Sequence, residues 1–369
     1  MVSASILILT AGFGEGHNAA ARNLAVAFKV YHPELTVAVS DIFDESYGFW
    51  NRFLQSLYRF VINRAPFLWS AFYKFLDRSP MATEGVGLFG KAAKALRARI
   101  GASDATVVVS CFPGYGGFLD KVRSELHPFT YVTVVTDSLT INSVWWRCSS
   151  DYFLVSNEPT AKSMERGGVA RHKICVTGFP VPVVFSEAGP LREIPPSNGI
   201  WNVLYMVNSG HDVALDIIRE LLSLDQIALT VTCGRNEALM QKARQLANEL
   251  QKHIELHGWT SEIPSLLRRS HVLISKAGGA TVQEALAAQT PLIITQVVPG
   301  QEEGNALLVV ENGAGEIART PRKITDALRG LFIAGGARYL QCYQASALIG
   351  HPTGSREAAN FTASLCLRG

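Results

Sequence analysis

Short apolar runs alternate with longer helical patterns along this chain, and this alternation constrains its fold more than any other feature. The runs are rich in β-branched residues and are continuously apolar, as strands of a parallel sheet are when helices cover both of its faces. Strands are expected at residues 5–10, 36–40, 106–110, 131–136, 152–155, 174–177, 202–207, 228–232, 254–257, 272–275 and 292–295. The sequence therefore predicts an α/β fold made of βαβ units.

One break in the alternation predicts two domains. Residues 190–199 end in the run PPSNG, which is typical of a linker. The 369 residues also exceed the length of one ordinary core. We therefore expect a first domain at residues 1–190 and a second at residues 200–345.

Composition narrows the class of protein. With 48% hydrophobic and 18% charged residues, the chain is typical of a globular protein and not of a disordered one. A net charge of +3 gives no reason to expect a nucleic-acid partner. The six cysteines form no CxxC pair and fit reduced thiols. No leader and no stretch near the ~20 apolar residues of a spanning helix is recognised, so we expect a cytoplasmic protein.

Residues 47–80 differ from the rest because they combine aromatic and basic side chains. Trp50, Phe53 and Leu57 recur at helical spacing, and Pro66 can start a second helix that carries Trp69. Such helices can lie in a membrane interface, with rings among the headgroups and cations on anionic lipid. They can equally be ordinary helices whose aromatic side chains fill the core. Both interpretations stay open at this point.

The first constellation is LTAGFGEGHN at residues 9–18, where three glycines follow an expected strand and a helix starts near His17. Glycines let a ligand approach the backbone, and a new helix offers free N–H groups. The run has neither P-loop nor dinucleotide spacing. His17 stands where a general base would meet a substrate hydroxyl, although a capping or surface histidine is the alternative.

The second constellation is a single acid, Asp137, directly after the expected strand at residues 131–136. A carboxylate there can orient a histidine or hold a sugar hydroxyl. It can also cap the helix that follows.

The third constellation is KAGGATVQEALA at residues 276–287, followed by a strand and the loop PGQEEGN at residues 299–305. A phosphate at this helix start would meet backbone donors and the Thr281 hydroxyl. Glu284, one turn further, can accept both hydroxyls of a ribose, and the polar loop suits a hexose. The order predicts a nucleotide sugar; an ordinary βαβ unit with a polar loop is the alternative.

Two segments carry a resemblance to a known family: HGWTSEIPSLLRRSHVLISKAGGATVQEALA and PGQEEGNALLVVENGAG. Over roughly residues 6–318 the chain resembles the monogalactosyldiacylglycerol synthase and processive diacylglycerol glucosyltransferase family. It is more distantly similar to the lipid-linked N-acetylglucosamine transferase of peptidoglycan synthesis. The resemblance implies a GT-B fold, with two Rossmann-like domains, a cleft between them and the sugar donor on the second. It also implies that a C-terminal helix within residues 346–369 crosses back to the first domain.

The resemblance further implies an inverting transfer of a hexose from a UDP-sugar to a lipid hydroxyl, most simply that of diacylglycerol. The enzyme would work on the inner face of a membrane, without a metal or other cofactor. His17 would be the base, with Asp137 as the second catalytic candidate. Donor-side candidates are Gly234, Arg235, Asn236, Gly258, Trp259, Lys276, Gly278, Gly279, Ala280, Thr281, Glu284, Gly300, Gln301, Glu302 and Asn305. Acceptor-side candidates are Gly14, Gly16, Trp50, Phe53 and Trp69.

The chain also departs from the family pattern. Residues 110–113 read SCFP where the family has a histidine, and histidines expected after Asp137 are missing. The loop at residues 208–212 has few glycines, and Gln289 stands where a glycine is common. These departures leave the acceptor lipid open. They also motivate one alternative function, a non-catalytic relative that binds a nucleotide sugar or a lipid. A UDP-sugar 2-epimerase, which shares the implied fold, is the other alternative.

Overall fold

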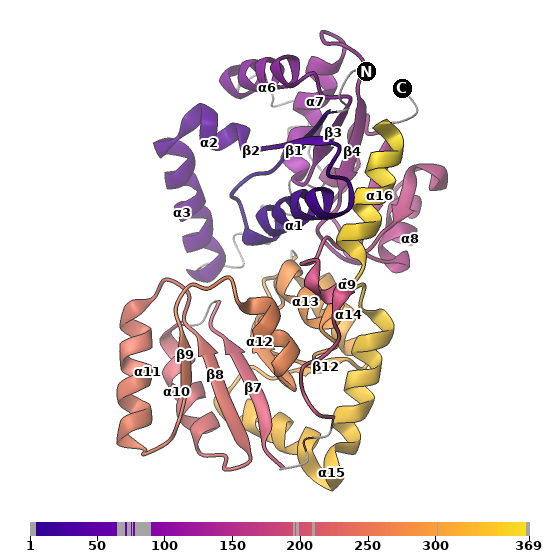
Figure 1. The fold of residues 1–369 in the computed structure, drawn as a ribbon. Coiled ribbons are helices and arrows are strands. Elements are labelled where there is room, and N and C mark those ends of the chain that lie inside the picture. Colours follow the sequence, from indigo (N-terminus) through magenta and orange to yellow (C-terminus); the bar gives the residue numbers. More distant parts are fainter. Residues whose placement is uncertain are drawn as a thin grey trace. The chain divides into compact units, whose positions relative to one another are not determined.

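The computed structural model describes residues 5–64, 71, 75, 77, 90–194, 196, 199–208, 211–300 and 302–366 (Figure 1). The chain forms two compact units. The first comprises Met1–Val183, Pro299–Gly304 and Thr353–Gly369, and the second comprises Val184–Val298 and Asn305–Pro352. Each unit contains a six-stranded sheet whose paired strands are all parallel. The predicted α/β architecture is confirmed.

The first sheet has the order β2-β1-β3-β4-β5-β6. Its strands are β1 (Ser5–Leu9), β2 (Thr36–Ser40), β3 (Val107–Ser110), β4 (Thr130–Val134), β5 (Tyr152–Val155) and β6 (Ile174–Val176). The unit's described helices are α1 (Glu15–Tyr31), α2 (Ile42–Tyr47), α3 (Phe49–Arg64), α6 (Gly90–Ser103), α7 (Gly116–Arg123), α8 (Glu158–Arg166) and α16 (Gly354–Cys366), with short turns η2 (Pro113–Tyr115), η3 (Ser143–Trp145) and η4 (Arg171–Lys173). Ile6 pairs with Val37 on one side and Val107 on the other, so β1 is a buried inner strand.

The C-terminal helix α16 belongs to the first unit and packs against α1. His32 Nε2, just after α1, lies 2.8 Å from Asn360 Oδ1 of α16. The Ser355 hydroxyl donates a hydrogen bond to the Val181 carbonyl. The last helix of the chain is therefore fixed to the domain that begins it.

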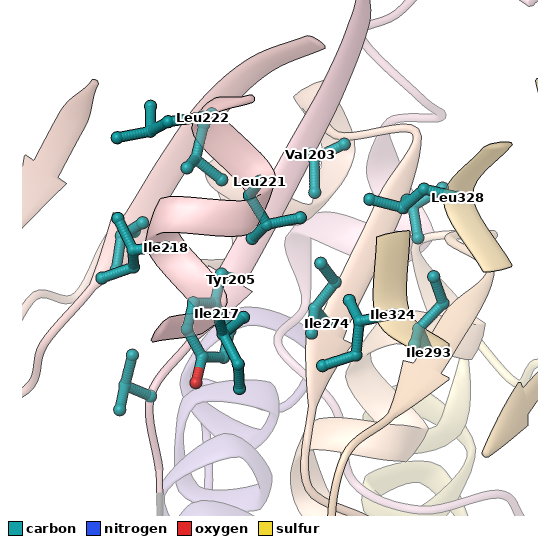
Figure 2. Packing of buried hydrophobic residues seen from close by; sticks show 14 of the residues in the cluster. Val203, Tyr205, Ile217, Ile218, Leu221, Leu222, Ile274, Ile293, Ile324 and Leu328 are labelled. Atoms are coloured by element: carbon teal, nitrogen blue, oxygen red, sulfur yellow. The ribbon is translucent and has the colours of Figure 1, made fainter. Parts of the chain in front are cut away.

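The second sheet has the order β12-β11-β10-β7-β8-β9. Its strands are β7 (Trp201–Met206), β8 (Ile227–Thr232), β9 (Glu255–His257), β10 (Val272–Ser275), β11 (Leu292–Ile294) and β12 (Gly315–Ile317). Its helices are α9 (Val184–Glu187), α10 (His211–Leu222), α11 (Glu237–Glu249), α12 (Ile263–Arg269), α13 (Gly279–Ala287), α14 (Glu303–Glu311) and α15 (Pro321–Ile349). In its core, Val203 and Ile274 of the sheet pack with Leu221 of α10 and Leu328 of α15 (Figure 2).

The segment between the two sheets is bonded to the second unit. The Leu191 backbone N–H donates to the Arg268 carbonyl at 2.8 Å, and Arg192 donates to the Gln289 carbonyl at 2.7 Å. Gln289 has a φ of 57°, the left-handed conformation that favours glycine. Its side chain accepts a hydrogen bond from the Tyr343 hydroxyl at 2.6 Å, so contacts within the unit hold this strained residue.

All eleven expected strands are present, within a residue or two at each end, and the structure adds β12. This strand reads GEI and lies at the edge of its sheet, where only β11 pairs with it. It has no apolar run, so the pattern that located the other strands could not find it. Among the described residues, none of the helices is both long enough and apolar enough to cross a membrane.

Candidate functional site

In the first unit, the order of the strands reverses between β1 and β3. In doubly wound sheets ligands bind at the carboxyl ends of the strands at this point. Phe13 follows β1, Phe112 follows β3 and Thr136 follows β4, while His17 is the third residue of α1. The fold thus brings the first predicted constellation to the position where a ligand is expected.

His17 is held at this position by one hydrogen bond and two aromatic neighbours. The residue is 7% exposed, and its Nδ1 lies 2.9 Å from the Thr136 hydroxyl oxygen. The imidazole packs edge-on against Phe112, with 5.1 Å between ring centroids, and lies 5.8 Å from the Trp145 ring. This is not the exposed surface histidine of the alternative interpretation.

The charge state of His17 follows from its burial. Desolvation lowers its pKa to about 4, because the buried ring cannot keep a charged form hydrated, and the backbone of Cys111 opposes this only in part. The imidazole is therefore neutral near pH 7. A neutral imidazole has a lone pair that can accept a proton.

Gly14 caps the N-terminus of α1 beside this ring. Its φ of 130° lies in the region that favours glycine. A Cβ added there would lie 3.8 Å from His17 Cδ2 and 4.0 Å from Nε2. Gly14 therefore keeps space at the Nε2 edge of the imidazole. Gly16, the other glycine of the acceptor-side prediction, lies in the first turn of α1.

Asp137 orients an aromatic neighbour of His17. Its Oδ2 accepts a hydrogen bond from Trp145 Nε1 at 2.8 Å. The helix-cap role that the sequence left open for Asp137 belongs to Asn142, whose side chain accepts from the Val144 backbone N–H at the start of η3. The hydrogen bond to His17 Nδ1 is made by Thr136, which the sequence analysis passed over although it directly precedes Asp137.

Helix α3 is turned so that its polar side faces the unit. Asn51 is 2% exposed, and a Cβ added to Gly12 would lie only 2.5 Å from Gln55 Nε2. On the same side, Tyr58 contacts the Phe13 ring at a centroid distance of 6.3 Å. Phe13 in turn stacks on Phe112, the neighbour of His17. A continuous series of aromatic contacts thus joins α3 to His17.

The opposite side of α3 is apolar and exposed. Between 46% and 71% of each of six side chains is accessible to solvent: Phe49, Trp50, Phe53, Leu54, Leu57 and Phe60. The interpretation that placed the aromatic side chains in the core is therefore wrong for these residues of α3. Trp69 and the second helix expected after Pro66 lie outside the described residues.

The second unit has its own reversal of strand order, between β7 and β10. Asn208, after β7, donates from Nδ2 to the hydroxyl of Ser275, the last residue of β10, at 3.2 Å. The third predicted constellation begins at the next residue, Lys276. The phosphate-binding loop expected from the sequence therefore lies at the switch point of its sheet.

The turn after β10 gathers groups suited to an anion. Helix α13 starts at Gly279, and its N-cap, Gly278, has no side chain to occupy the free backbone N–H groups. A Cβ added to Gly278 would lie 3.6 Å from Lys276 Nζ and 3.8 Å from the Thr281 hydroxyl oxygen. A cation, a hydroxyl and a helix N-terminus thus converge there, with Ala280 in the first turn.

Two further residues of this constellation differ in their surroundings. Glu284 is half-buried on α13, one turn after Ala280. Asn305 is buried and donates from Nδ2 to the Ala277 carbonyl at 3.1 Å, which ties α14 to the glycine turn. Its Oδ1 has no hydrogen-bond partner among the described residues.

The polar loop of residues 299–305 divides between the two units. Gly300 and the buried Glu302 fall in the segment Pro299–Gly304, which groups with the first unit. Gln301 lies outside the described residues. In the part of the chain that the structure describes, no three His, Cys, Asp or Glu side chains gather as a metal ion would require.

The loops after β8 and β9 lie together. Arg235 places its guanidinium 6.0 Å from the ring of Trp259, which is largely exposed, and a Cβ added to Gly258 would lie 3.5 Å from the Gly234 carbonyl oxygen. Asn236 has a structural task, because its side chain caps α11 by accepting from the Leu239 backbone N–H at 3.0 Å. Of the three residues predicted after β8, Arg235 is therefore the one with an exposed side chain beside the aromatic ring.

Comparison with known proteins agrees with this geometry. Residues 17–181 match the family described as monogalactosyldiacylglycerol (MGDG) synthase, and residues 198–329 match glycosyl transferases group 1. The chain is a glycosyltransferase. This glycosyltransferase is similar to the processive diacylglycerol beta-glucosyltransferase of Bacillus cereus (strain G9842). The two are 28% identical over 340 residues, which cover 88% of this chain and 85% of that relative.

Solved structures agree on the fold. MurG of Acinetobacter baumannii superposes with a TM-score of 0.65 at 14% identity, over 98% of this chain and 99% of that one. The UDP-GlcNAc 2-epimerase of Neisseria meningitidis, bound to UDP-GlcNAc, gives 0.59 at 14% identity, over 99% and 100%. Together with the two parallel sheets, these similarities confirm the predicted GT-B fold of the glycosyltransferase.

Proposed function

We propose that this glycosyltransferase moves a hexose from a UDP-sugar to the hydroxyl of a membrane lipid, with diacylglycerol as the acceptor and with inversion at the anomeric carbon. One observation carries the proposal: a neutral histidine with open space beside its Nε2 edge is joined by aromatic contacts to a helix with an exposed apolar face. A base and a lipid-compatible surface thus occur in one unit. The similarity to a diacylglycerol glucosyltransferase supports the same acceptor.

The chemistry on the acceptor side requires one proton transfer. The lipid hydroxyl approaches Nε2 of His17 at the Gly14 edge of the ring. As the hydroxyl oxygen attacks the anomeric carbon, Nε2 takes the hydroxyl proton and the bond to the UDP oxygen breaks. Because the oxygen attacks from the face opposite the leaving UDP, the configuration inverts.

The donor side binds the nucleotide and stabilises the charge of the leaving group. Lys276, Thr281 and the backbone N–H groups of α13 hold the diphosphate, where they meet the negative charge that develops as UDP departs. Glu284 accepts the ribose hydroxyls. Trp259 lies beside the uracil, and the buried Asn305, bonded to the Ala277 carbonyl, supports the loop that faces the hexose.

The membrane contact is made by α3, and basic residues of α6 add attraction to anionic lipid. Both helices pack against α2. The exposed face of α3 offers aromatic rings that prefer the headgroup region. Helix α6 carries four exposed cations, Lys91, Lys94, Arg97 and Arg99, of which Arg97 forms an ion pair with Glu125 at 2.6 Å. This arrangement suits a protein that works at the cytosolic surface of a membrane.

A variant of the exposed face tests the membrane contact. We expect Trp50→Ser with Phe53→Ser to lower binding to phosphatidylglycerol-containing vesicles by at least about tenfold, because burying a large apolar side chain is worth roughly 1.5–3 kcal/mol. Vesicle cosedimentation measures the change. Ile333→Ser with Leu348→Ser removes two exposed apolar side chains of the second unit and serves as the matched control. Equal vesicle binding by both double variants would exclude α3 as the membrane contact.

Radiolabelled transfer tests the function itself. UDP-glucose, UDP-galactose and UDP-N-acetylglucosamine are offered separately, with liposomes that contain diacylglycerol or a total lipid extract. We expect label in the organic phase with one donor and diacylglycerol. Label only with the total extract would replace diacylglycerol by another lipid. Bound UDP without label in any lipid would reject the lipid acceptor and favour an epimerase or a non-catalytic protein.

A further inference from the structure

The hydrogen bond between His17 and Thr136 joins two elements that are far apart in the sequence. His17 lies in the first turn of α1, and Thr136 is the second residue after β4. The 2.9 Å bond is inside the unit, since both residues are buried. Water therefore competes little for either group, and the bond constrains the imidazole strongly.

We propose that Thr136 is the positioning residue of His17: its hydroxyl oxygen accepts the Nδ1 hydrogen and so keeps the Nε2 lone pair at the Gly14 edge. This inference rests on the proposed role of His17 as the base. A neutral imidazole has one hydrogen, and only the form with that hydrogen on Nδ1 can take a proton at Nε2. A hydroxyl can either donate or accept; with Thr136 as the acceptor, the bond holds the hydrogen on Nδ1 and fixes the plane of the ring.

The neighbouring carboxylate has a different task. Asp137 binds the indole N–H of Trp145, and Trp145 packs beside His17. Asp137 thus fixes the aromatic wall, while the uncharged Thr136 fixes the hydrogen bond. A carboxylate on Nδ1 would favour the charged imidazolium, whereas a hydroxyl leaves the ring neutral and ready to accept a proton.

The form of His17 can be measured without activity. Ring nitrogen-15 NMR of histidine-labelled, full-length protein near pH 7 distinguishes a protonated from an unprotonated Nδ1, and the His17 signals are assigned by their loss in His17→Gln. We expect His17 to have its hydrogen on Nδ1. A hydrogen on Nε2 would overturn the proposal. This result does not depend on transfer, so it stays decisive even if the proposed function fails for lack of a lipid product.

A substitution tests the effect on turnover. Thr136→Val removes the hydroxyl at similar volume, and we expect kcat to fall about tenfold or more, while KM and UDP affinity stay within about twofold. Thr136→Ser should restore kcat to within about threefold of the original. Unchanged kcat in Thr136→Val, or no rescue by serine, would contradict the proposal.

A matched control comes from β4, the strand that precedes Thr136. Thr133 is buried on β4 and donates to the Ser150 hydroxyl at 3.0 Å, away from His17. Thr133→Val should lower stability to a similar degree but leave kcat and the His17 nitrogen signals unchanged. If it lowers kcat as much as Thr136→Val does, the effect of Thr136 is structural and the proposal fails.

Discussion

Replacing His17 by alanine is expected to abolish sugar transfer and to leave the affinity for UDP nearly unchanged. A positioned general base contributes about 10²–10⁴-fold to a rate, and His17 is the group that would take the proton of the acceptor hydroxyl. The groups proposed to hold UDP lie in the second unit, whereas His17 lies in the first. Initial rates of label transfer and calorimetric titration with UDP measure the two quantities.

His172→Ala is the control for this variant, because His172 is an exposed histidine of the same unit. It should leave both transfer and UDP affinity unchanged. A loss of UDP binding in His17→Ala would assign the histidine a structural role. Persistent transfer would show that another group accepts the proton.

The lowered pKa of His17 sets the pH dependence that we expect for the activity of the enzyme without substitutions. Below its pKa the imidazole is charged and cannot act as a base, so activity falls as the pH drops through about 4. An ordinary histidine with a pKa of 6.5 would be only roughly 3% neutral at pH 5. We therefore expect kcat at pH 5 to stay close to its value at pH 7. An acidic limb centred near pH 6.5 would contradict the buried, neutral state.

The sequence was sufficient for every described strand except β12, because those strands are continuous apolar runs, and it was insufficient where a contact depends on distant residues. Periodicity predicted α3 as an amphipathic helix. It could not say which side faces inward, since Gln55 lies inward where it meets the loop at Gly12, and Asn51 is buried on the same side of the helix. The sequence likewise predicted a functional acid at Asp137. It could not predict that Trp145 donates a hydrogen bond to this acid, because that contact depends on the path of the chain after β4. Local patterns thus predicted the elements better than the partners of their side chains.

The hydrogen-bond partner of the Thr136 hydroxyl is another contact that the sequence could not predict. A threonine after a strand carries no signal of its own, because most such hydroxyls bond to nearby backbone. Its bond to His17 spans 119 positions and exists because β1, β3 and β4 are neighbours in one sheet. Once the strand order is known, residues that follow adjacent strands can be paired, and Thr136 becomes the natural partner of a histidine on α1.

On the donor side, Glu284→Ala is expected to weaken UDP-sugar binding by about 1–3 kcal/mol, roughly 5- to 150-fold in affinity. The size follows from the loss of charge-assisted hydrogen bonds to ribose hydroxyls at a half-buried site, where water replaces them poorly. Glu284→Gln keeps the shape and one acceptor oxygen, so its loss should be smaller. Calorimetric titration with UDP and with the UDP-sugar measures all three proteins.

The role of Glu284 is decided by comparing the affinity for UDP with the affinity for pyrophosphate, which lacks the uridine. If the carboxylate holds the ribose, the alanine variant loses affinity for UDP but keeps its weak affinity for pyrophosphate, which binds the α13 N-terminus alone. Equal losses for both ligands would mean that the substitution disturbs α13 itself. Glu311→Ala, an exposed acid on α14, should change neither affinity. If Glu284→Ala also changes neither, the carboxylate lies outside the donor site.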